Sequence, residues 1–166
     1  MAYLPRGKTF DEFELGQEFT TASRTITEAD VVAFAGLSGD FNPLHTDEEF
    51  AKATPMKTRI AHGPLILSIA SGQANLLGVF EGTTIALLSM TTRYTAPVKF
   101  GDTVRTVLKL TDKKESKKPD RGIATFSVNV LNQRDEKVIE GEWVVMLTRT
   151  RQPRPAGGGL EEGAKS

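Results

Sequence analysis

The chain has 166 residues, of which 39% are hydrophobic, and this size and composition suit one domain with a substantial core. Its 21 basic and 21 acidic side chains balance, which argues against binding to nucleic acid or to an anionic membrane through bulk electrostatics. The sequence has no cysteine, which excludes disulfides and thiolate metal sites, and with only two histidines no zinc site is expected. It has no signal-like or long apolar segment, so a cytoplasmic protein is predicted.

The first part of the chain predicts a strand over residues 18–25 followed by helices. Thr27 and Asp30 have the spacing of a capping box, so a helix is expected to begin after Thr27. Gly39 is its expected end, because glycine readily adopts the left-handed conformation that closes a helix. A second capping signal in the acidic segment 46–49 predicts another short helix.

A longer helix is expected over residues 64–77, beginning at Pro64 and carrying several small residues on its surface. After it, four segments are predicted to be strands, over residues 84–96, 103–111, 122–131 and 137–149, and three of them have partial two-residue alternation of apolar and polar side chains. Residues 113–121 are expected to form a charged loop between two of these strands, and residues 132–136 a tighter one.

This order of elements predicts an α+β fold, with helices on one face of an antiparallel sheet. The helix over residues 64–77 is the candidate to be wrapped by the sheet. Residues 1–150 are predicted to form the single domain. Residues 151–166 are rich in proline and glycine and nearly free of large apolar side chains, so a disordered tail is predicted there.

The tract over residues 39–45, Gly-Asp-Phe-Asn-Pro-Leu-His, places Asp40 and His45 five residues apart. Pro43 restricts its own backbone and that of Asn42, so the connection is expected to be rigid. Asp40 is expected just after one helix and His45 just before the next, where the pair could activate a water and move its proton. The spacing alone leaves a second interpretation open, in which these residues only shape and cap the turn.

A second patch lies at the predicted start of the long helix, where His62 and Gly63 precede Pro64. The Gly63 N–H is expected to be unpaired at the positive end of the helix, a suitable place for an oxygen that gains negative charge. An ordinary Gly-Pro helix start is the alternative. His62 is interpreted as a structural or hydrogen-bonding residue in preference to a second base, and Ser71 as a packing residue or a polar contact.

Five short motifs between about residue 16 and residue 148 together match one known family. They are AGLSGDFNPLHTD over 35–47 followed by Phe50-Ala51, IAHG over 60–63, SIASG over 68–72, YTAPV over 94–98 and GDT over 101–103. The chain thereby resembles the MaoC-like, (R)-specific enoyl-CoA hydratases and dehydratases, and the first motif is highly specific to them. Pro64 departs from the pattern, because many relatives carry methionine or another apolar residue there.

The resemblance implies a hotdog fold, in which an antiparallel β-sheet wraps around a long central α-helix. It also implies a homodimer, or a higher oligomer of dimers, with the acyl thioester bound near the subunit interface. In the family, the equivalents of Asp40 and His45 are catalytic and activate the water. The expected substrate-binding residues are Asn42, His62, Gly63 and Ser71, with the Gly63 N–H directed at the thioester oxygen.

The implied reaction is the reversible syn addition of water to trans-2-enoyl-CoA, which gives (3R)-3-hydroxyacyl-CoA. No metal or redox cofactor is expected, since coenzyme A or an acyl carrier is part of the substrate. The sequence leaves open the length of the acyl chain, the carrier and the pathway. It also leaves open which of Asp40 and His45 is the acid and which the base, because their titrations should be coupled.

Two other functions compete with that of a hydratase. A hotdog acyl-CoA thioesterase commonly places an acidic residue on the central helix, whereas residues 64–77 contain no Asp or Glu, only Gln73. A non-catalytic subunit that binds acyl thioesters would not need to retain both the Asp40–His45 pair and Gly63.

Overall fold

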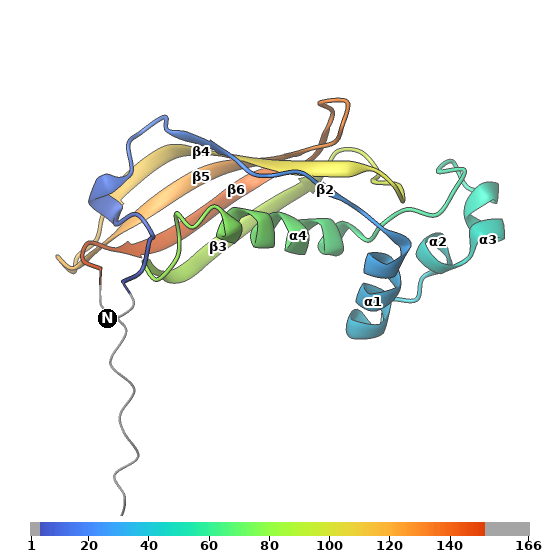
Figure 1. Ribbon diagram of the computed structural model, residues 1–166, viewed down its shortest axis with the longest axis horizontal. Coiled ribbons are helices and arrows are strands. Elements are labelled where there is room, and N and C mark those ends of the chain that lie inside the picture. Colours follow the sequence, from blue (N-terminus) through green and yellow to red (C-terminus); the bar gives the residue numbers. More distant parts are fainter. Residues whose placement is uncertain (1–3, 152–166) are drawn as a thin grey trace, which may run out of the picture.

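The computed structural model describes residues 4–151 and shows one antiparallel sheet that wraps around a helix, α4 (Figure 1). The strand order along the sheet is β1–β4–β5–β6–β3, and β2 also pairs with β4. The strands are β1 Glu18–Thr20, β2 Arg24–Thr25, β3 Thr84–Tyr94, β4 Thr103–Glu115, β5 Arg121–Leu131 and β6 Lys137–Thr148. This is the α+β hotdog arrangement that the sequence predicted.

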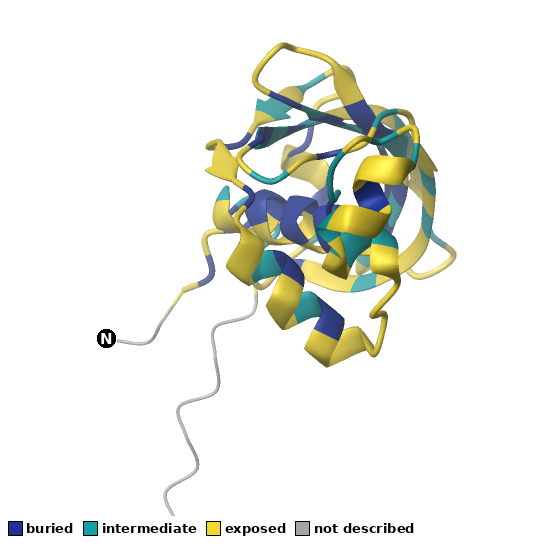
Figure 2. Ribbon diagram, turned by 90° about the vertical axis from the view of Figure 1, so that its right-hand side faces the viewer, coloured by how far each residue is buried: buried dark blue, intermediate teal, exposed yellow. Residues whose placement is uncertain are grey.

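The helices divide into a central one and a group beyond one end of the sheet (Figure 1). They are α1 Glu28–Ser38, α2 Pro43–Thr46, α3 Glu48–Ala53 and the central α4 Gly63–Leu76; a 3-10 turn, η1 Phe10–Glu12, lies in the N-terminal segment. Viewed from that end, α4 is buried along one face, whereas α1 and α3 are mostly exposed and α2 has no buried residue (Figure 2). The segment that carries the Asp40–His45 tract therefore projects from the core.

The core lies between α4 and the inner face of the sheet. In β5 every second residue is buried, from Gly122 to Val130, as expected for a strand with one face against a core. Ala70 and Ala74 of α4 are almost completely buried, and their small side chains allow the helix to lie close to the strands. Each large apolar side chain buried in this core stabilises the fold by about 1.5–3 kcal/mol.

The predicted strand over residues 18–25 is interrupted, which corrects the sequence-based assignment. Between β1 and β2 the chain leaves the β4 ladder, and the buried Gln73 side chain of α4 supplies the missing partner. Its Nε2 donates to the carbonyl oxygens of Ala22, at 2.9 Å, and Val104, at 3.0 Å. Its Oε1 accepts a hydrogen bond from the Thr106 hydroxyl at 3.0 Å. A helix side chain thus satisfies backbone groups that a continuous strand would have paired.

The charged loop predicted over residues 113–121 is also shorter than expected. Strand β4 continues to Glu115 and β5 begins at Arg121, so only residues 116–120 connect them. The ladder continues through a register shift between Leu110 and Asp112. Lys113 and Lys114 therefore belong to β4, whereas Lys117 and Lys118 lie in the loop.

The N-terminal segment closes the end of the fold opposite α1. Phe13 packs against Phe19, Phe80 and Phe126 with ring centroids 5.5–6.0 Å apart. Arg151, the first residue of the predicted tail, forms an ion pair with Glu12. Residues 152–166 lie outside the described part of the chain. The domain boundary at residue 150 stays a prediction. Within residues 4–151, no helix is long and apolar enough to cross a membrane.

Candidate active site

The candidate site begins where α1 ends. The Thr27 hydroxyl accepts a hydrogen bond from the Asp30 N–H, and the Asp30 carboxylate accepts one from the Thr27 N–H, which completes the predicted capping box. Gly39 closes the helix at φ 76°, in the left-handed region where glycine carries no steric penalty. The chain therefore reverses direction immediately before Asp40.

The turn after Asp40 is built from local hydrogen bonds. The Asn42 N–H donates to the Asp40 carboxylate at 3.2 Å, and the Leu44 N–H donates to Oδ1 of Asn42 at 3.0 Å. With Pro43 at its first position, this cap starts the four-residue helix α2. His45 consequently lies in the last turn of α2, which corrects the expectation that it directly precedes the next helix; Asp47 caps α3 instead.

His45 is held in one orientation by a backbone carbonyl. Its Nδ1 lies 2.7 Å from the carbonyl oxygen of Ile60. Because a carbonyl oxygen can only accept, Nδ1 carries the proton in this hydrogen bond, and Nε2 is the nitrogen available for proton exchange. The sequence did not mark Ile60, since every residue has a carbonyl group and only the fold shows which one is used.

His62 is completely buried behind this pair. Its Nε2 lies 2.9 Å from the main-chain carbonyl oxygen of Asp40. Its ring packs against that of His45, with centroids 3.8 Å apart and planes at 33°, while Phe34 of α1 lies on it at 5.1 Å. Its Nδ1 has no hydrogen-bond partner among the described residues.

The three side chains form one compact cluster. The Asp40 carboxylate, the His45 ring and the His62 ring each offer an atom within 4.8 Å of the other two. An oxygen and a nitrogen at such a separation can both hydrogen-bond one water molecule, since each bond spans about 2.7–3.2 Å. One ion bound by both imidazoles would have to lie in both ring planes, so the stacked rings would first have to rotate. The arrangement thus suits a shared water better than a metal ion.

A cavity of about 440 Å³ adjoins His45. Apolar side chains dominate its wall, which includes Met56, Ile60, Tyr94 and Val138, and Gly63 also borders it. Gly63 is the first residue of α4, and its N–H has no hydrogen-bond partner among the described residues. A donor at the positive end of a 14-residue helix therefore borders the same cavity as His45.

Tyr94, at the end of β3, covers Gly63. A Cβ atom placed on Gly63 would lie 2.7 Å from Cε1 of the Tyr94 ring, which is closer than real contacts allow. Any larger residue at this position would therefore displace the aromatic ring. The YTAPV motif contains Tyr94, but the sequence did not indicate this contact.

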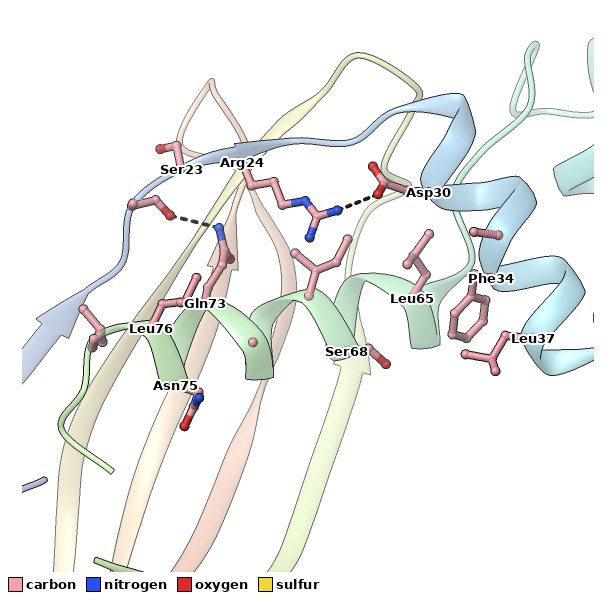
Figure 3. Close-up of a pocket in the computed structure, with 15 residues that line it drawn as sticks. Ser23, Arg24, Asp30, Phe34, Leu37, Leu65, Ser68, Gln73, Asn75 and Leu76 are labelled. Atoms are coloured by element: carbon pink, nitrogen blue, oxygen red, sulfur yellow. Dashed lines mark hydrogen bonds and ion pairs between the residues drawn. The ribbon is translucent and has the colours of Figure 1, made fainter. Parts of the chain in front are cut away.

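A larger groove of about 830 Å³ runs between α1 and α4 (Figure 3). It is mostly apolar, with Phe34, Leu37 and Leu65 near one end, and the Arg24–Asp30 ion pair lies along it. Neither Asp40 nor His45 borders this groove. Size alone would favour it as the reaction site, but the chemistry favours the smaller cavity.

The segment before α4 is braced against the projecting helices. The Arg59 guanidinium forms ion pairs with Glu28 of α1, at 2.7 Å, and Glu48 of α3, at 3.2 Å. A hydrogen bond from the Arg59 N–H is the main cause that holds the pKa of Glu48 below its ordinary value. These contacts fix the position of α1 and α3 relative to the neighbouring Ile60.

The structure brings together Asp40, His45, His62 and Gly63 of the predicted set. Asn42 lies beside them, with Oδ1 engaged as the cap of α2. Ser71 is exposed on α4 and borders neither cavity. The catalytic and substrate-binding roles assigned to these residues stay predictions.

Comparisons with known proteins find similarity to one family. The family described as MaoC like domain matches residues 12–131. The chain is 36% identical over 139 residues, which are 83% of its length and 90% of the relative's, to an (R)-specific enoyl-CoA hydratase of Rhodospirillum rubrum. It is 37% identical over 135 residues, covering 81% and 95%, to an enzyme of the same name from Aeromonas caviae. The solved structure of an R-hydratase from Pseudomonas aeruginosa superposes with a TM-score of 0.73 at 33% identity, covering 87% of this chain and 88% of that one.

Proposed function

The chain belongs to the family of MaoC-like domains, and we propose that it is an (R)-specific enoyl-CoA hydratase, a hydro-lyase that adds water reversibly to trans-2-enoyl-CoA. The observation that carries this proposal is the meeting of two chemical functions: His45, which has the Asp40 carboxylate within 4.8 Å, and Gly63 border the same cavity. The Asp40–His45 pair can bind and deprotonate a water, and the Gly63 N–H can stabilise negative charge on a thioester oxygen.

The reaction needs both functions at once. When the water oxygen bonds to C3 of the enoyl group, electron density moves through C2 onto the thioester oxygen. The Gly63 N–H and the α4 dipole stabilise this enolate-like charge. One member of the Asp40–His45 pair takes the proton from water, and a proton is delivered to C2 from the same side. In His45 the exchanging atom is Nε2, because Nδ1 is bound to the Ile60 carbonyl.

The assembly we propose is a homodimer formed through β3. This strand pairs with β6 on one side, and within the described residues its other edge has no neighbouring strand. Ile85, Leu87 and Leu88 on β3 are 44–48% exposed. A long apolar edge of this kind is a template for pairing with another strand, and β3 of a second copy supplies the same edge in return. The dimer would cover these side chains and extend the sheet.

A thioesterase is disfavoured by the environment of Gln73. Among the side chains of α4, the Gln73 amide is the most similar to the carboxyl group that such enzymes use. This amide is buried and forms hydrogen bonds with Ala22, Val104 and Thr106. It is therefore not available to direct a water at a thioester carbonyl. No metal or redox cofactor enters the proposed mechanism, and the cytoplasmic location remains a prediction.

A hydration assay tests this function directly. The purified protein is incubated with trans-2-enoyl-CoAs from crotonyl-CoA to long-chain thioesters, and loss of the conjugated enoyl absorbance is followed. We expect turnover with at least one chain length, a (3R)-3-hydroxyacyl product on chiral analysis, and no release of free thiol. Binding of crotonyl-CoA without turnover of any substrate would contradict the proposal, and thiol release from saturated acyl-CoA would indicate a thioesterase.

A further inference from the structure

We propose that His62 is a positioning residue, which holds Asp40 and His45 in their reactive arrangement without contacting the substrate. This inference rests on the proposed hydratase function. It replaces the role in substrate binding that the sequence suggested for His62 with one that acts through its two neighbours. Three observations carry it: the complete burial of the ring, its hydrogen bond to Asp40, and its stacking on His45.

The hydrogen bond fixes the main chain of Asp40. This residue lies in an exposed turn just after the left-handed Gly39, where the backbone has no helix or strand to restrain it. The carbonyl oxygen of Asp40 can only accept, so Nε2 of His62 donates to it at 2.9 Å. A donor that is itself completely buried thus anchors the catalytic carboxylate from the interior.

The stacking fixes the ring of His45. The Ile60 carbonyl holds that ring at its edge, at 2.7 Å, and the His62 ring supports its face, with centroids 3.8 Å apart. Phe34 of α1 packs on His62 in turn. The hydrogen bond to Ile60 alone would allow the His45 ring to rotate about that bond. The hydrogen bond and the stacked His62 ring together determine where Nε2 of His45 points.

His62 can serve as a rigid support because the segment around it is anchored on both sides. Arg59 is paired with Glu28 and Glu48, and the Ala61 N–H donates to the Val98 carbonyl at 2.8 Å. The next residue, Gly63, begins α4. The same five residues, 59–63, therefore position the acid–base pair and the proposed thioester donor relative to one another.

The unpartnered Nδ1 of His62 argues against a second role as an acid. In the neutral ring with the proton on Nε2, Nδ1 is only a buried lone pair. A proton on Nδ1 would bury a donor with no acceptor among the described residues, which is unfavourable, and more so when the ring is charged. We therefore assign the neutral Nε2–H form to His62 and proton exchange to Asp40 and His45.

The kinetic test compares His62→Gln with His62→Asn. The glutamine amide nitrogen reaches the position of Nε2 and can donate to the Asp40 carbonyl, whereas the shorter asparagine places its amide near Nδ1. We expect His62→Asn to lower kcat by about tenfold to 100-fold with little change in KM, because misplacing reacting groups by about 1 Å has effects of that size. His62→Gln should recover most of this loss. A higher KM with unchanged kcat would overturn the proposal, as would equal losses in both variants.

A spectroscopic test does not depend on activity or on the folding of a variant. The chain has only two histidines, so NMR of the ¹⁵N-labelled wild-type protein resolves their ring nitrogens directly. At pH 8 we expect the Nε2–H tautomer for His62 and the Nδ1–H tautomer for His45. The opposite tautomer in His62 would overturn the inference. If the wild type showed these tautomers but hydrated no enoyl-CoA, the proposed function would fail while the positioning contacts stood.

Discussion

The Nδ1 atom of His45 lies 2.7 Å from the carbonyl oxygen of Ile60, a residue 15 positions further along the chain. This contact selects one tautomer of the imidazole and leaves Nε2 for the reaction. Gly63, three residues after Ile60, presents its N–H at the start of α4. One short segment thus links the side chain proposed to activate water to the group proposed to bind the thioester.

Removing either member of the acid–base pair should abolish most activity. Asp40→Asn and His45→Gln are each expected to lower turnover by about 100-fold or more, because general acid–base groups contribute on that scale. Both residues lie on the projecting segment outside the buried core, so the thermal unfolding midpoint should change little. Steady-state hydration rates and a thermal melt check this expectation, and a rate near that of the wild type in either variant would refute the assigned roles.

Gly63→Ala should lower activity for a steric reason. The added methyl group would lie 2.7 Å from the Tyr94 ring, and that ring is half exposed and can move away. We expect a loss in kcat/KM of about tenfold or more with a small change in stability, because Tyr94 borders the cavity. In the matched double variant Gly63→Ala/Tyr94→Ala the clash is absent, so adding Gly63→Ala to Tyr94→Ala should cost much less. An equal cost in both backgrounds would show that Tyr94 is not the cause.

Gln73→Glu should destabilise the fold without creating a thioesterase. The glutamine amide donates to the carbonyl oxygens of Ala22 and Val104, whereas a carboxylate would repel them. Leaving buried polar groups unpaired costs about 1–3 kcal/mol for each group. A protonated carboxyl group can still donate one hydrogen bond, so the loss should be larger at neutral pH than at acidic pH. Denaturant unfolding at several pH values tests this, with Gln73→Met as the uncharged comparison.

The capping box of α1 should make stability depend on pH. Burial opposes ionisation of Asp30, but hydrogen bonds from Thr27 and the charge of Arg24 outweigh it and hold the pKa of Asp30 below its ordinary value. The carboxylate therefore contributes stability above the unfolded pKa of about 3.9, and this contribution is lost as the pH falls through the folded value.

Asp30→Asn should accordingly lower the free energy of unfolding by about 0.3–1 kcal/mol at neutral pH, with the difference from wild type shrinking below about pH 4. Urea unfolding at pH 7 and pH 3 measures both quantities. Glu49→Gln is the control, because its ion pair with Lys52 is exposed and contributes little at any pH. A deficit in Asp30→Asn that stays constant with pH would show that ionisation of this carboxyl group is not the cause.

Charges on the open edge of β3 should dissociate the proposed dimer. Leu87 and Leu88 are each about half exposed on this strand, and a lysine at either position could remain solvated in a monomer but not in a paired sheet. We expect the wild type to sediment as a dimer and Leu87→Lys/Leu88→Lys to sediment mainly as a monomer. Leu76→Lys, on the exposed part of α4, serves as the comparison for added charge alone. A monomeric wild type would exclude this assembly.

Two differences between prediction and structure show where sequence patterns are not sufficient to predict local structure. The strand predicted over residues 18–25 is interrupted because Gln73, about 50 residues away, satisfies the carbonyl that the ladder leaves open. His45 was expected just before a helix, but Asn42 and Pro43 are sufficient to start a short helix that contains it. Local propensity could not predict the interruption of the strand, because the Gln73 contact that decides it is distant in the sequence. Nor could it predict α2, because this helix is only a single turn long.

The sequence by itself determined the local structure and the identity of the chemical groups. The Thr27–Asp30 cap, the Gly39 stop, the strand alternation and the 39–45 motif all depend on neighbours within a few residues, so spacing is enough to predict them. Only the tertiary structure decided how the groups meet: the Ile60 carbonyl on His45, the buried His62 behind Asp40, and Tyr94 over Gly63. Backbone carbonyls and ring faces occur throughout any chain, and folding alone selects the few that support a reaction.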